Sequence, residues 1–476
     1  MTAKVQVTNI GKYAGKEVVE LFARAPQGKL TKPLMSLVSF AKTTELAPGE
    51  SQKIDLEVPA YNFASFDDTG ITGHKYAYIL EKGEYKFFLG ENVRDVQEIG
   101  SFEYSEDTVL EELEAICAPK EYIDRIIAQK INGSYIPKKV TVKPEKPYLR
   151  ERIIKNLPKE IGHIVHNYNF ELVKSGEISV ETFVSSLNNE ELEALTRGQG
   201  GMDSNYGVAG NAGAFGGIIP ELNKKGIPPV ITTDGPAGIR VRKYTSLIPC
   251  VTALASTFNT ELVEKLTTEM GRELQNAGSN VLLAPGMNIH RNVLCGRNFE
   301  YFSEDPLLTG KMAAAYVKGI QASGGSACPK HFACNNQESF RTVNNSIVSQ
   351  RALREIYLKG FEICVKEAKP LNIMTSYNKI NGVWSHYNYD LVTTVLRKEW
   401  GFDGSVMTDW WMQHSQSHEF PNLRDNAYRV RSQVDVYMPG SFKKTEKKYK
   451  PDKSLLETVG LKNGLTRGEL ERSAIN

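Results

Sequence analysis

Over roughly the first hundred residues, apolar side chains recur at every second position, as expected for strands with one buried face. The runs with this alternation are Val5 and Val7; Val19, Leu21 and Ala23; Ile54, Leu56 and Val58; Tyr76, Tyr78 and Leu80; and Tyr85, Phe87 and Leu89. Turn-forming pairs such as Pro48-Gly49 and Lys82-Gly83 separate the runs at short intervals. The pattern predicts that residues 1–104 form an antiparallel β-sandwich.

Residues 105–184 have a different pattern, and we expect them to be a connector. Between 106 and 130 the apolar residues fall at helical spacing: Leu110, Leu113 and Ile116, then Ile123, Ile126 and Ile127. The stretch 136–152 is rich in lysine and proline, which indicates a solvated linker. The sequence therefore predicts a helical, Lys- and Pro-rich linker.

From about residue 185 onward, short apolar runs alternate with longer amphipathic stretches. This alternation predicts βα units around a parallel sheet. The strands are expected at 228–233, 281–284, 326–331, 371–376, 405–408 and 434–438, and clear helical stretches at 260–275 and 350–366.

Composition narrows the class of protein only slightly. The 476 residues suffice for about two or three domains, and a net charge of +2 gives no reason to expect nucleic acid or a membrane as a partner. The N-terminus lacks the apolar core of a secretory signal and no run is long enough to span a membrane, so a cytoplasmic location is expected. The six cysteines are scattered, which is typical of reduced thiols.

Polar clusters follow most of the predicted barrel strands. They contain Asp234, then Asn288 and His290, Lys330 and His331, Tyr377 and Asn378, and finally Asp409. In a βα barrel the carboxyl ends of the strands meet at one mouth, so these clusters are expected to converge on one pocket. Such groups, together with the flat indoles of Trp410 and Trp411, suit a neutral polyhydroxylated ligand such as a sugar.

Two further motifs are weaker. Cys328, His331 and Cys334 have a C-x2-H-x2-C spacing, but a strand ending near His331 would direct Cys328 and His331 to opposite faces, so no metal site is expected. The glycine-rich segment 207–217 matches neither a dinucleotide fingerprint nor a P-loop, and we interpret it as a loop at the mouth of the pocket. No cofactor is predicted.

Six ordered motifs resemble the signatures of glycoside hydrolase family 3, the β-glucosidase and β-xylosidase group. They are Asp234-Gly-Pro-Ala-Gly-Ile-Arg240; Ala284-Pro-Gly-Met-Asn-Ile-His290; Cys295-Gly-Arg-Asn-Phe-Glu-Tyr-Phe-Ser-Glu-Asp-Pro306; Lys330-His-Phe-Ala-Cys-Asn-Asn-Gln-Glu338; Met374-Thr-Ser-Tyr-Asn378; and Gly401-Phe-Asp-Gly404 with Asp409-Trp410. The resemblance covers residues 185–476 and implies a TIM-type (β/α)8 or near-(β/α)8 barrel. The segment Val7-Thr-Asn-Ile-Gly-Lys-Tyr-Ala-Gly-Lys-Glu-Val18-Val19 resembles the fibronectin type III-like domain of such enzymes.

The resemblance also implies roles for individual residues. Asp409 corresponds to the nucleophile of a retaining glycosidase, which forms a covalent glycosyl-aspartate. The subsite for the nonreducing-end sugar is expected to contain Asp234, Arg240, Arg297, Lys330, His331, Arg341, Met374, Tyr377 and Trp410. The implied reaction releases β-D-glucose from β-glucosides or oligosaccharides.

The sequence departs from the common family pattern in two ways. The fibronectin-like part precedes the barrel, as in circularly permuted members, and its first strand is expected to be missing. No α/β sandwich is present, although in the glucosidase branch that domain supplies the acid/base glutamate. We therefore expect the rear part of a longer enzyme, whose acid comes from a separate α/β sandwich domain or chain.

Within the chain, Glu300, Glu338 and Glu419 are candidate acids, but each has a weak claim. The branch that acts on N-acetylglucosaminides uses a barrel-loop histidine, yet its lysine-histidine motif continues with proline and glycine, whereas Phe332 follows here. Two alternatives stay open: a β-xylosidase or α-L-arabinofuranosidase with the same mechanism, and an inactive sugar-binding fragment.

Overall fold

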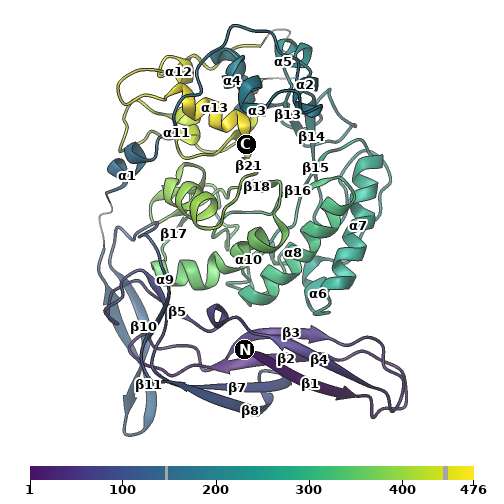
Figure 1. Cartoon of the computed structure of the whole chain (residues 1–476), viewed down its shortest axis with the longest axis vertical. Coiled ribbons are helices and arrows are strands. Elements are labelled where there is room, and N and C mark those ends of the chain that lie inside the picture. Colours follow the sequence, from purple (N-terminus) through teal and green to yellow (C-terminus); the bar gives the residue numbers. More distant parts are fainter. Residues whose placement is uncertain (145–147, 443–448) are drawn as a thin grey trace.

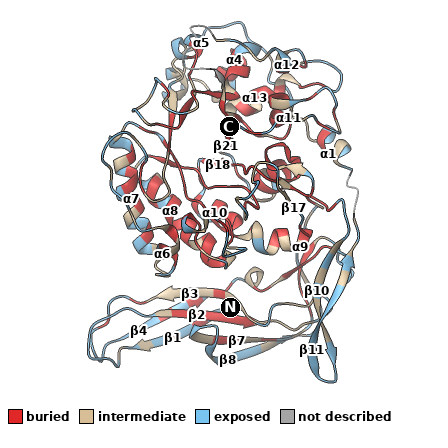
Figure 2. Cartoon of the chain, turned by 180° about the vertical axis from the view of Figure 1, so that it is seen from behind, coloured by how far each residue is buried: buried red, intermediate tan, exposed pale blue. Residues whose placement is uncertain are grey.

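The computed structural model describes residues 1–144, 148–442 and 449–476, with no side-chain description at 441 and 442. A β domain at the N-terminal end lies beneath a larger α/β domain, and the exposed ribbon β10–β11 projects beside the β domain (Figure 1). The buried residues concentrate in the middle of the α/β domain and between the sheets of the β domain (Figure 2). Within the described residues, the helices are all too short or too polar to cross a membrane.

The N-terminal domain is a β-sandwich, as its alternation predicted. One sheet has the order β3-β2-β7-β8, a second consists of β1 and β4, and β5-β6-β9 form a third. Their apolar faces, including Leu21, Val38, Leu56 and Phe87, enclose one core. The strands are β1 (Thr2–Thr8), β2 (Val18–Arg24), β3 (Ser36–Lys42), β4 (Ser51–Glu57), β5 (Ser65–Asp67), β6 (Ala77–Leu80), β7 (Gly83–Asn92), β8 (Asp95–Tyr104) and β9 (Thr108–Glu112).

The predicted helix over 106–130 is wrong. Residues in this range form β9 and most of β10 (Ile123–Ile131), which pairs antiparallel with β11 (Ser134–Val142). Asn132 and Gly133 both have positive φ (49° and 84°), the geometry of a two-residue hairpin turn for which Asn-Gly is the favoured sequence. The hairpin signal was thus present in the sequence, and a short run of helical spacing obscured it. Residues 145–147 of the predicted linker lie outside the described residues.

The larger domain is built on an eight-stranded sheet with the order β16-β15-β14-β13-β12-β22-β21-β18. Its strands are β12 (Arg197–Gln199), β13 (Gly213–Gly216), β14 (Pro229–Asp234), β15 (Val281–Leu283), β16 (Ser326–Ala327), β18 (Asn372–Met374), β21 (Ser405–Trp410) and β22 (Val436–Phe442). The two edge strands also approach one another, because Phe332 donates to the Met374 carbonyl at 2.8 Å and Met374 donates to that of Pro329 at 3.0 Å. The sheet is therefore a nearly closed barrel.

The barrel is not a regular (β/α)8 barrel, since β13 runs antiparallel to both β12 and β14. All six predicted strands are confirmed in position, whereas β12 and β13 were missed. The interpretation of 207–217 as a mouth loop holds only for its first part, because Gly213–Gly216 is β13 itself. Glycine suits this place: Gly213 has φ of 120°, and a Cβ there would lie 2.7 Å from the Gly200 carbonyl oxygen.

Helices pack around the outside of the barrel, and the helices predicted at 260–275 and 350–366 are confirmed. The described helices are α1 (Leu149–Lys155), α2 (Glu171–Lys174), α3 (Val180–Ser185), α4 (Asn189–Leu195), α5 (Pro220–Lys224), α6 (Val251–Ala255), α7 (Thr260–Asn276), α8 (Pro306–Ala322), α9 (Gln350–Ala352), α10 (Lys359–Ala368), α11 (Asp425–Arg431), α12 (Lys453–Leu456) and α13 (Arg467–Ile475), with wider-turned helical segments at η3 (Leu353–Tyr357) and η5 (Asp390–Glu399) and short turns at η1 (Ala60–Asn62), η2 (Asn298–Glu300) and η4 (Ser385–Tyr387). Three short strands, β17 (Asn345–Ser346), β19 (Lys379–Ile380) and β20 (Val383–Trp384), form a small sheet beside the barrel.

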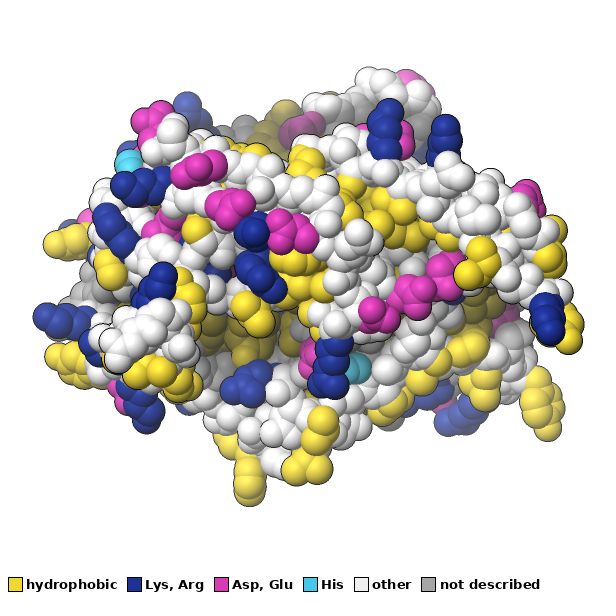
Figure 3. Space-filling model, turned by 90° about the horizontal axis from the view of Figure 1, so that it is seen from below, with side chains coloured by type: hydrophobic (Ala, Val, Ile, Leu, Met, Phe, Trp, Pro, Cys, Tyr) yellow, Lys and Arg dark blue, Asp and Glu magenta, His cyan; other side chains and the backbone are white. Residues whose placement is uncertain are grey.

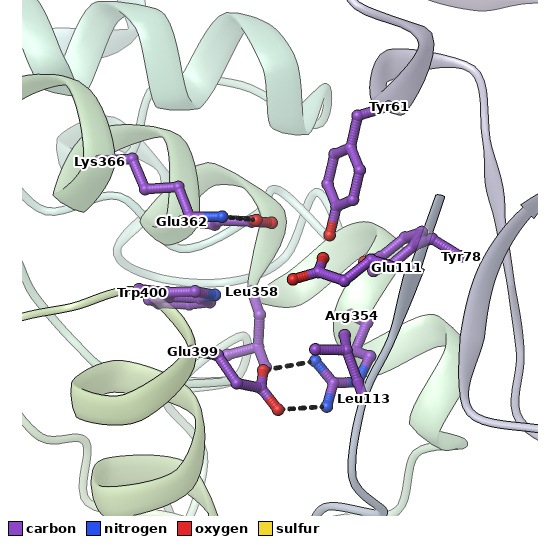
Figure 4. A pocket seen from close by; sticks show the side chains of 10 residues that line it. All are labelled: Tyr61, Tyr78, Glu111, Leu113, Arg354, Leu358, Glu362, Lys366, Glu399 and Trp400. Atoms are coloured by element: carbon purple, nitrogen blue, oxygen red, sulfur yellow. Dashed lines mark hydrogen bonds and ion pairs between the residues drawn. The ribbon is translucent and has the colours of Figure 1, made fainter. Parts of the chain in front are cut away.

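The two domains meet through buried polar contacts. In Figure 4, Tyr61 and Tyr78 of the N-terminal domain face a small pocket that also borders the barrel helices. There the Arg354 guanidinium pairs with both carboxylate oxygens of Glu399, at 2.8 and 2.9 Å, and also donates to the Glu114 carbonyl. Bidentate pairing fixes both groups in orientation as well as in distance. The face of the molecule seen from below intersperses acidic and basic side chains (Figure 3).

Candidate active site

A cavity of about 250 Å3 opens at the carboxyl ends of the barrel strands. Asp409 and eight of the nine predicted sugar-binding residues line it, while the ninth, Arg240, is ion-paired to one of the lining residues. The structure thus brings together predicted site residues that are up to 176 positions apart in the sequence, from Asp234 to Trp410. The residues around the cavity are Met202, Ala212, Asp234, Leu283, Arg297, Lys330, His331, Arg341, Met374, Tyr377, Asp409, Trp410 and Trp411.

Asp409 lies near the end of β21, where alternation along the strand turns its side chain toward the cavity. Its Oδ1 accepts the backbone N–H of Trp410 at 2.7 Å, and its Oδ2 lies 3.6 Å from Nε2 of His331. Burial raises the pKa of Asp409 above its ordinary value, while Arg297, Lys330 and the Trp410 N–H favour the ionised form.

Asp234 is held very differently. It ends β14, and its two oxygens lie 3.1 Å from Lys330 Nζ and 3.1 Å from a terminal nitrogen of Arg240. Burial alone would raise the pKa of Asp234, but the charges of Lys330 and Arg240 outweigh it and lower the pKa below its usual value. This carboxylate is therefore ionised and offers a rigid acceptor to a hydroxyl group.

His331 is fully buried and held at its backbone. The Asn288 side chain accepts its N–H and donates to its carbonyl, both at 2.9 Å. Burial, followed by the charges of Arg297, Lys330 and Arg341, lowers the pKa of His331 well below its ordinary value. The ring is therefore neutral at physiological pH.

Two aromatic residues complete the wall next to the carboxylate. The Tyr377 hydroxyl donates to the Trp410 carbonyl at 2.8 Å, and burial followed by the charge of Asp409 raises the pKa of Tyr377. The Trp410 indole N–H is shared between the carbonyls of Gly201 and Ala212, at 3.0 and 2.9 Å. The loop that precedes β13 is thereby attached to β21.

The three glutamates proposed as candidate acids do not line the cavity. Glu300 is paired with the Arg297 guanidinium, and Glu338 accepts from Arg341 at 2.8 Å. Glu419 lies in the segment after β21, where its carboxylate accepts a hydrogen bond from the Ser417 hydroxyl at 3.4 Å. Among the described residues, Asp409 and Asp234 are the acidic side chains that line the cavity.

Sequence reasoning assigned no role to several lining residues. Met202 and Ala212 belong to the loop before β13, and Leu283 ends β15. Trp411 was noted as a possible sugar-stacking face and was left out of the predicted subsite, yet its side chain borders the cavity with 61% of its surface exposed. These apolar residues carry no distinctive motif, and only their position at the barrel mouth identifies them.

Among the residues that the structure describes, the side chains of His, Cys, Asp and Glu form no group of three or more that could hold a metal ion. Cys328 and Cys334 are both buried and unpaired, and burial raises the pKa of each thiol above its ordinary value. The imidazole of His331 instead faces Asp409.

Known proteins resemble both domains of this chain. Residues 17–93 match the fibronectin type III-like domain. A β-glucosidase of Ruminococcus albus is 42% identical over 482 aligned residues, covering 100% of this chain and 49% of that protein, and β-glucosidase A of Butyrivibrio fibrisolvens is 41% identical, covering 86% of this chain and 51% of that protein. The chain spans about half the length of the curated relatives it matches.

Solved structures of β-glucosidases also resemble this chain. A β-glucosidase from Paenibacillus barengoltzii superimposes with a TM-score of 0.91 at 42% identity, over 100% of this chain and 52% of that one. A glucose complex of β-glucosidase 3B from Thermotoga neapolitana gives a TM-score of 0.55 at 41% identity, over 62% of this chain and 41% of that one. Residues 195–475, more than half of the chain, match the glycosyl hydrolase family 3 N-terminal domain, and the chain therefore belongs to glycosyl hydrolase family 3.

Proposed function

We propose that this chain carries the nucleophile of a retaining β-glucosidase and that the nucleophile is Asp409. The observation that supports this most directly is the contrast between the two acids of the cavity. Asp234 has two cationic partners, whereas within the described residues Asp409 faces the cavity with only a neutral histidine at ion-pair distance. A carboxylate that is not neutralised by a direct ion pair keeps its lone pairs available for attack.

In the proposed reaction, Asp409 attacks the anomeric carbon of the terminal glucose and the bond to the leaving oxygen breaks. The resulting glycosyl ester is then hydrolysed by water, so the β configuration is retained. Asp234 and Lys330 are placed to bind neighbouring sugar hydroxyls, with Arg240 holding Asp234 in orientation. Burial would lower the pKa of Arg297, but its neighbours Tyr301, Glu300 and Asp409 raise it, and the protonated guanidinium favours the ionised form of Asp409.

The general acid is proposed to come from outside the described barrel. A retaining glycosidase needs a second carboxyl group about 5 to 5.5 Å from the first. Asp234 is held in ion pairs, and Glu300, Glu338 and Glu419 do not line the cavity. The matched relatives are about twice as long as this chain. We propose that an α/β sandwich, on a longer form of this protein or on another chain, supplies the acid.

Trapping with an activated 2-fluoro-2-deoxy-β-glucoside tests the nucleophile directly. The aryl leaving group needs little protonation, so a glycosyl adduct is expected on Asp409 by peptide mass spectrometry even without the acid. Asp409→Asn should give no adduct and should hydrolyse an aryl β-glucoside slower by about three orders of magnitude. An adduct on another residue would contradict the assignment.

Rates with matched aryl substrates separate the remaining alternatives. Aryl β-glucoside, β-xyloside and α-L-arabinofuranoside should be compared at the same concentration with the wild type and with Asp409→Asn. The glucoside is expected to be fastest. A faster xyloside or arabinofuranoside would reassign the substrate, and an equal, background rate for both proteins would favour a sugar-binding module without turnover.

A further inference from the structure

The two ring nitrogens of His331 face different groups. Nδ1 lies 3.1 Å from the hydroxyl oxygen of Tyr301, and Nε2 lies 3.6 Å from Oδ2 of Asp409. A neutral imidazole carries its proton on one nitrogen and accepts on the other. The group that occupies Nδ1 therefore decides whether His331 presents a donor or a lone pair to the nucleophile.

The hydrogen bonds around Tyr301 fix the direction in which its own proton points. Glu338 is paired with Arg341 at 2.8 Å and is therefore a pure acceptor. The Asn335 amide nitrogen lies 3.1 Å from Glu338 Oε1, and the other proton of that nitrogen is directed to the Tyr301 oxygen at 3.2 Å. Rotating the amide by half a turn would place its oxygen against the Glu338 carboxylate, so the ion pair sets the orientation of Asn335.

Since the Tyr301 oxygen already accepts from Asn335, its hydroxyl proton is free to be donated to Nδ1 of His331. We propose that Tyr301 is a positioning residue that holds His331 as the Nε2–H tautomer, so that the histidine presents a hydrogen-bond donor to the Asp409 carboxylate. This role rests on the proposed nucleophilic function of Asp409. The order of the hydrogen bonds is Arg341, Glu338, Asn335, Tyr301 and His331.

Burial strengthens this series of hydrogen bonds from Arg341 to His331, here called the relay. Tyr301, His331 and Asn335 each expose no more than 1% of their surface, so water does not compete for these hydrogen bonds. The Tyr301 ring also packs edge-on against the imidazole, with centroids 6.1 Å apart and an interplanar angle of 77°. Contact with the hydroxyl and contact with the ring thus restrain both the protonation and the orientation of His331.

The hydrogen bond from Tyr301 to His331 matters most when Asp409 loses its charge. The ionised Asp409 by itself favours a donor at Nε2, but the glycosyl ester is a much weaker acceptor. Tyr301 keeps the tautomer unchanged through that step, so that the same donor meets the carboxylate when water cleaves the ester. No proton has to be moved between the two ring nitrogens during the cycle.

The test is 15N NMR of protein labelled on histidine, without any substrate. The chain has eight histidines, and His331→Gln identifies the resonances of His331. We expect a hydrogen-bonded, unprotonated Nδ1 and a protonated Nε2 in the wild type. A spectrum of the Nδ1–H tautomer, or of a doubly protonated ring, at neutral pH would overturn the proposal.

Variants then isolate the tyrosine hydroxyl. Tyr301→Phe should shift the Nδ1 resonance toward that of a nitrogen without a hydrogen bond, and Asn335→Leu should shift it in the same direction. Tyr316→Phe is the matched control, because Tyr316 is equally buried and donates to the Pro236 carbonyl at 2.9 Å, away from His331. Unchanged His331 resonances in Tyr301→Phe would contradict the relay even in a fully folded variant.

Turnover of the aryl glucoside gives a second readout. Tyr301→Phe should lower kcat about tenfold, which is the rate equivalent of one hydrogen bond, whereas Tyr316→Phe should leave kcat within about twofold. Equal kcat values for Tyr301→Phe and the wild type would contradict a positioning role. The resting spectrum requires no turnover, so a wild type without glucosidase activity would refute the proposed function and leave the tautomer assignment independently testable.

Discussion

Asp409 and Asp435 are buried aspartates beside two neighbouring barrel strands, and the change to asparagine is expected to affect them in opposite directions. Asp409 faces the cavity and, among described residues, has no lysine or arginine at ion-pair distance. Asp435 immediately precedes β22, pairs with the Arg397 guanidinium and accepts the backbone N–H of Val406 at 2.7 Å. One acid is thus electrostatically unfavourable in the fold and the other is structural.

The magnitudes follow from these contacts. Asp435→Asn leaves the buried Arg397 charge without its partner and should lower the free energy of unfolding by about 3 to 5 kcal/mol. Burial raises the folded-state pKa of Asp409 above its ordinary 3.8. In the pH interval between 3.8 and the folded-state pKa, the folded protein therefore holds a proton that the unfolded chain has released. The wild type therefore loses stability as pH rises through the interval, by at most about 1.4 kcal/mol per pH unit. Asp409→Asn has no such loss and should be the more stable protein above it.

Denaturant unfolding between pH 4 and 8 would measure both effects. The four tryptophans, Trp384, Trp400, Trp410 and Trp411, all lie in the larger α/β domain, so their fluorescence follows the unfolding of that domain. Asp409→Asn should exceed the wild type in stability at neutral pH and approach it as pH falls. A variant that is less stable than the wild type at neutral pH would refute the reasoning that the ionised Asp409 is held at an energetic cost.

Three further outcomes are expected. Arg354→Met should lower the free energy of unfolding by about 3 to 5 kcal/mol, because Glu399 is left unpaired at the domain junction. Adding Glu399→Gln should restore part of the lost stability. Equal losses in the single and double variants would contradict this role of the ion pair. Burial and the nearby Asp305 raise the pKa of Glu20 to about 6, and burial raises that of Asp305 to about 6 as well. Glu20→Gln should therefore raise the melting temperature above pH 6 and not near pH 4. A gain at both pH values would argue against the raised pKa of Glu20. Arg297→Gln should move the acidic limb of kcat/KM to higher pH, because this guanidinium lowers the pKa of Asp409, the proposed nucleophile. An unmoved limb would exclude that role.

Much of the site could be predicted from the sequence because the relevant signals are local. The candidate site residues lie at the ends of short apolar runs, as with Asp234 at the end of β14 and Asp409 near the end of β21. In a barrel, the ends of such strands converge whatever lies between them. The alternation of the N-terminal strands is local as well, and it predicted the sandwich without knowledge of the strand pairing.

Other features depend on which distant segments meet. The Asn132-Gly133 turn was a local signal that helical spacing outweighed, and only the pairing of β10 with β11 resolved the ambiguity. The antiparallel direction of β13 could not be predicted, because four residues of glycine, alanine and phenylalanine carry no directional pattern.

The sequence by itself determined where Asp409 lies along the chain and that other polar clusters would surround it. The tertiary structure alone decided what each neighbour does. It paired Glu300 and Glu338 with arginines, gave Asp409 no lysine or arginine at ion-pair distance among the described residues, and placed the Tyr301 hydroxyl next to the imidazole of His331. The physical reason is range. Periodicity and turn chemistry act over a few residues, whereas ion pairing, burial and hydrogen-bond direction depend on contacts between residues far apart in the chain.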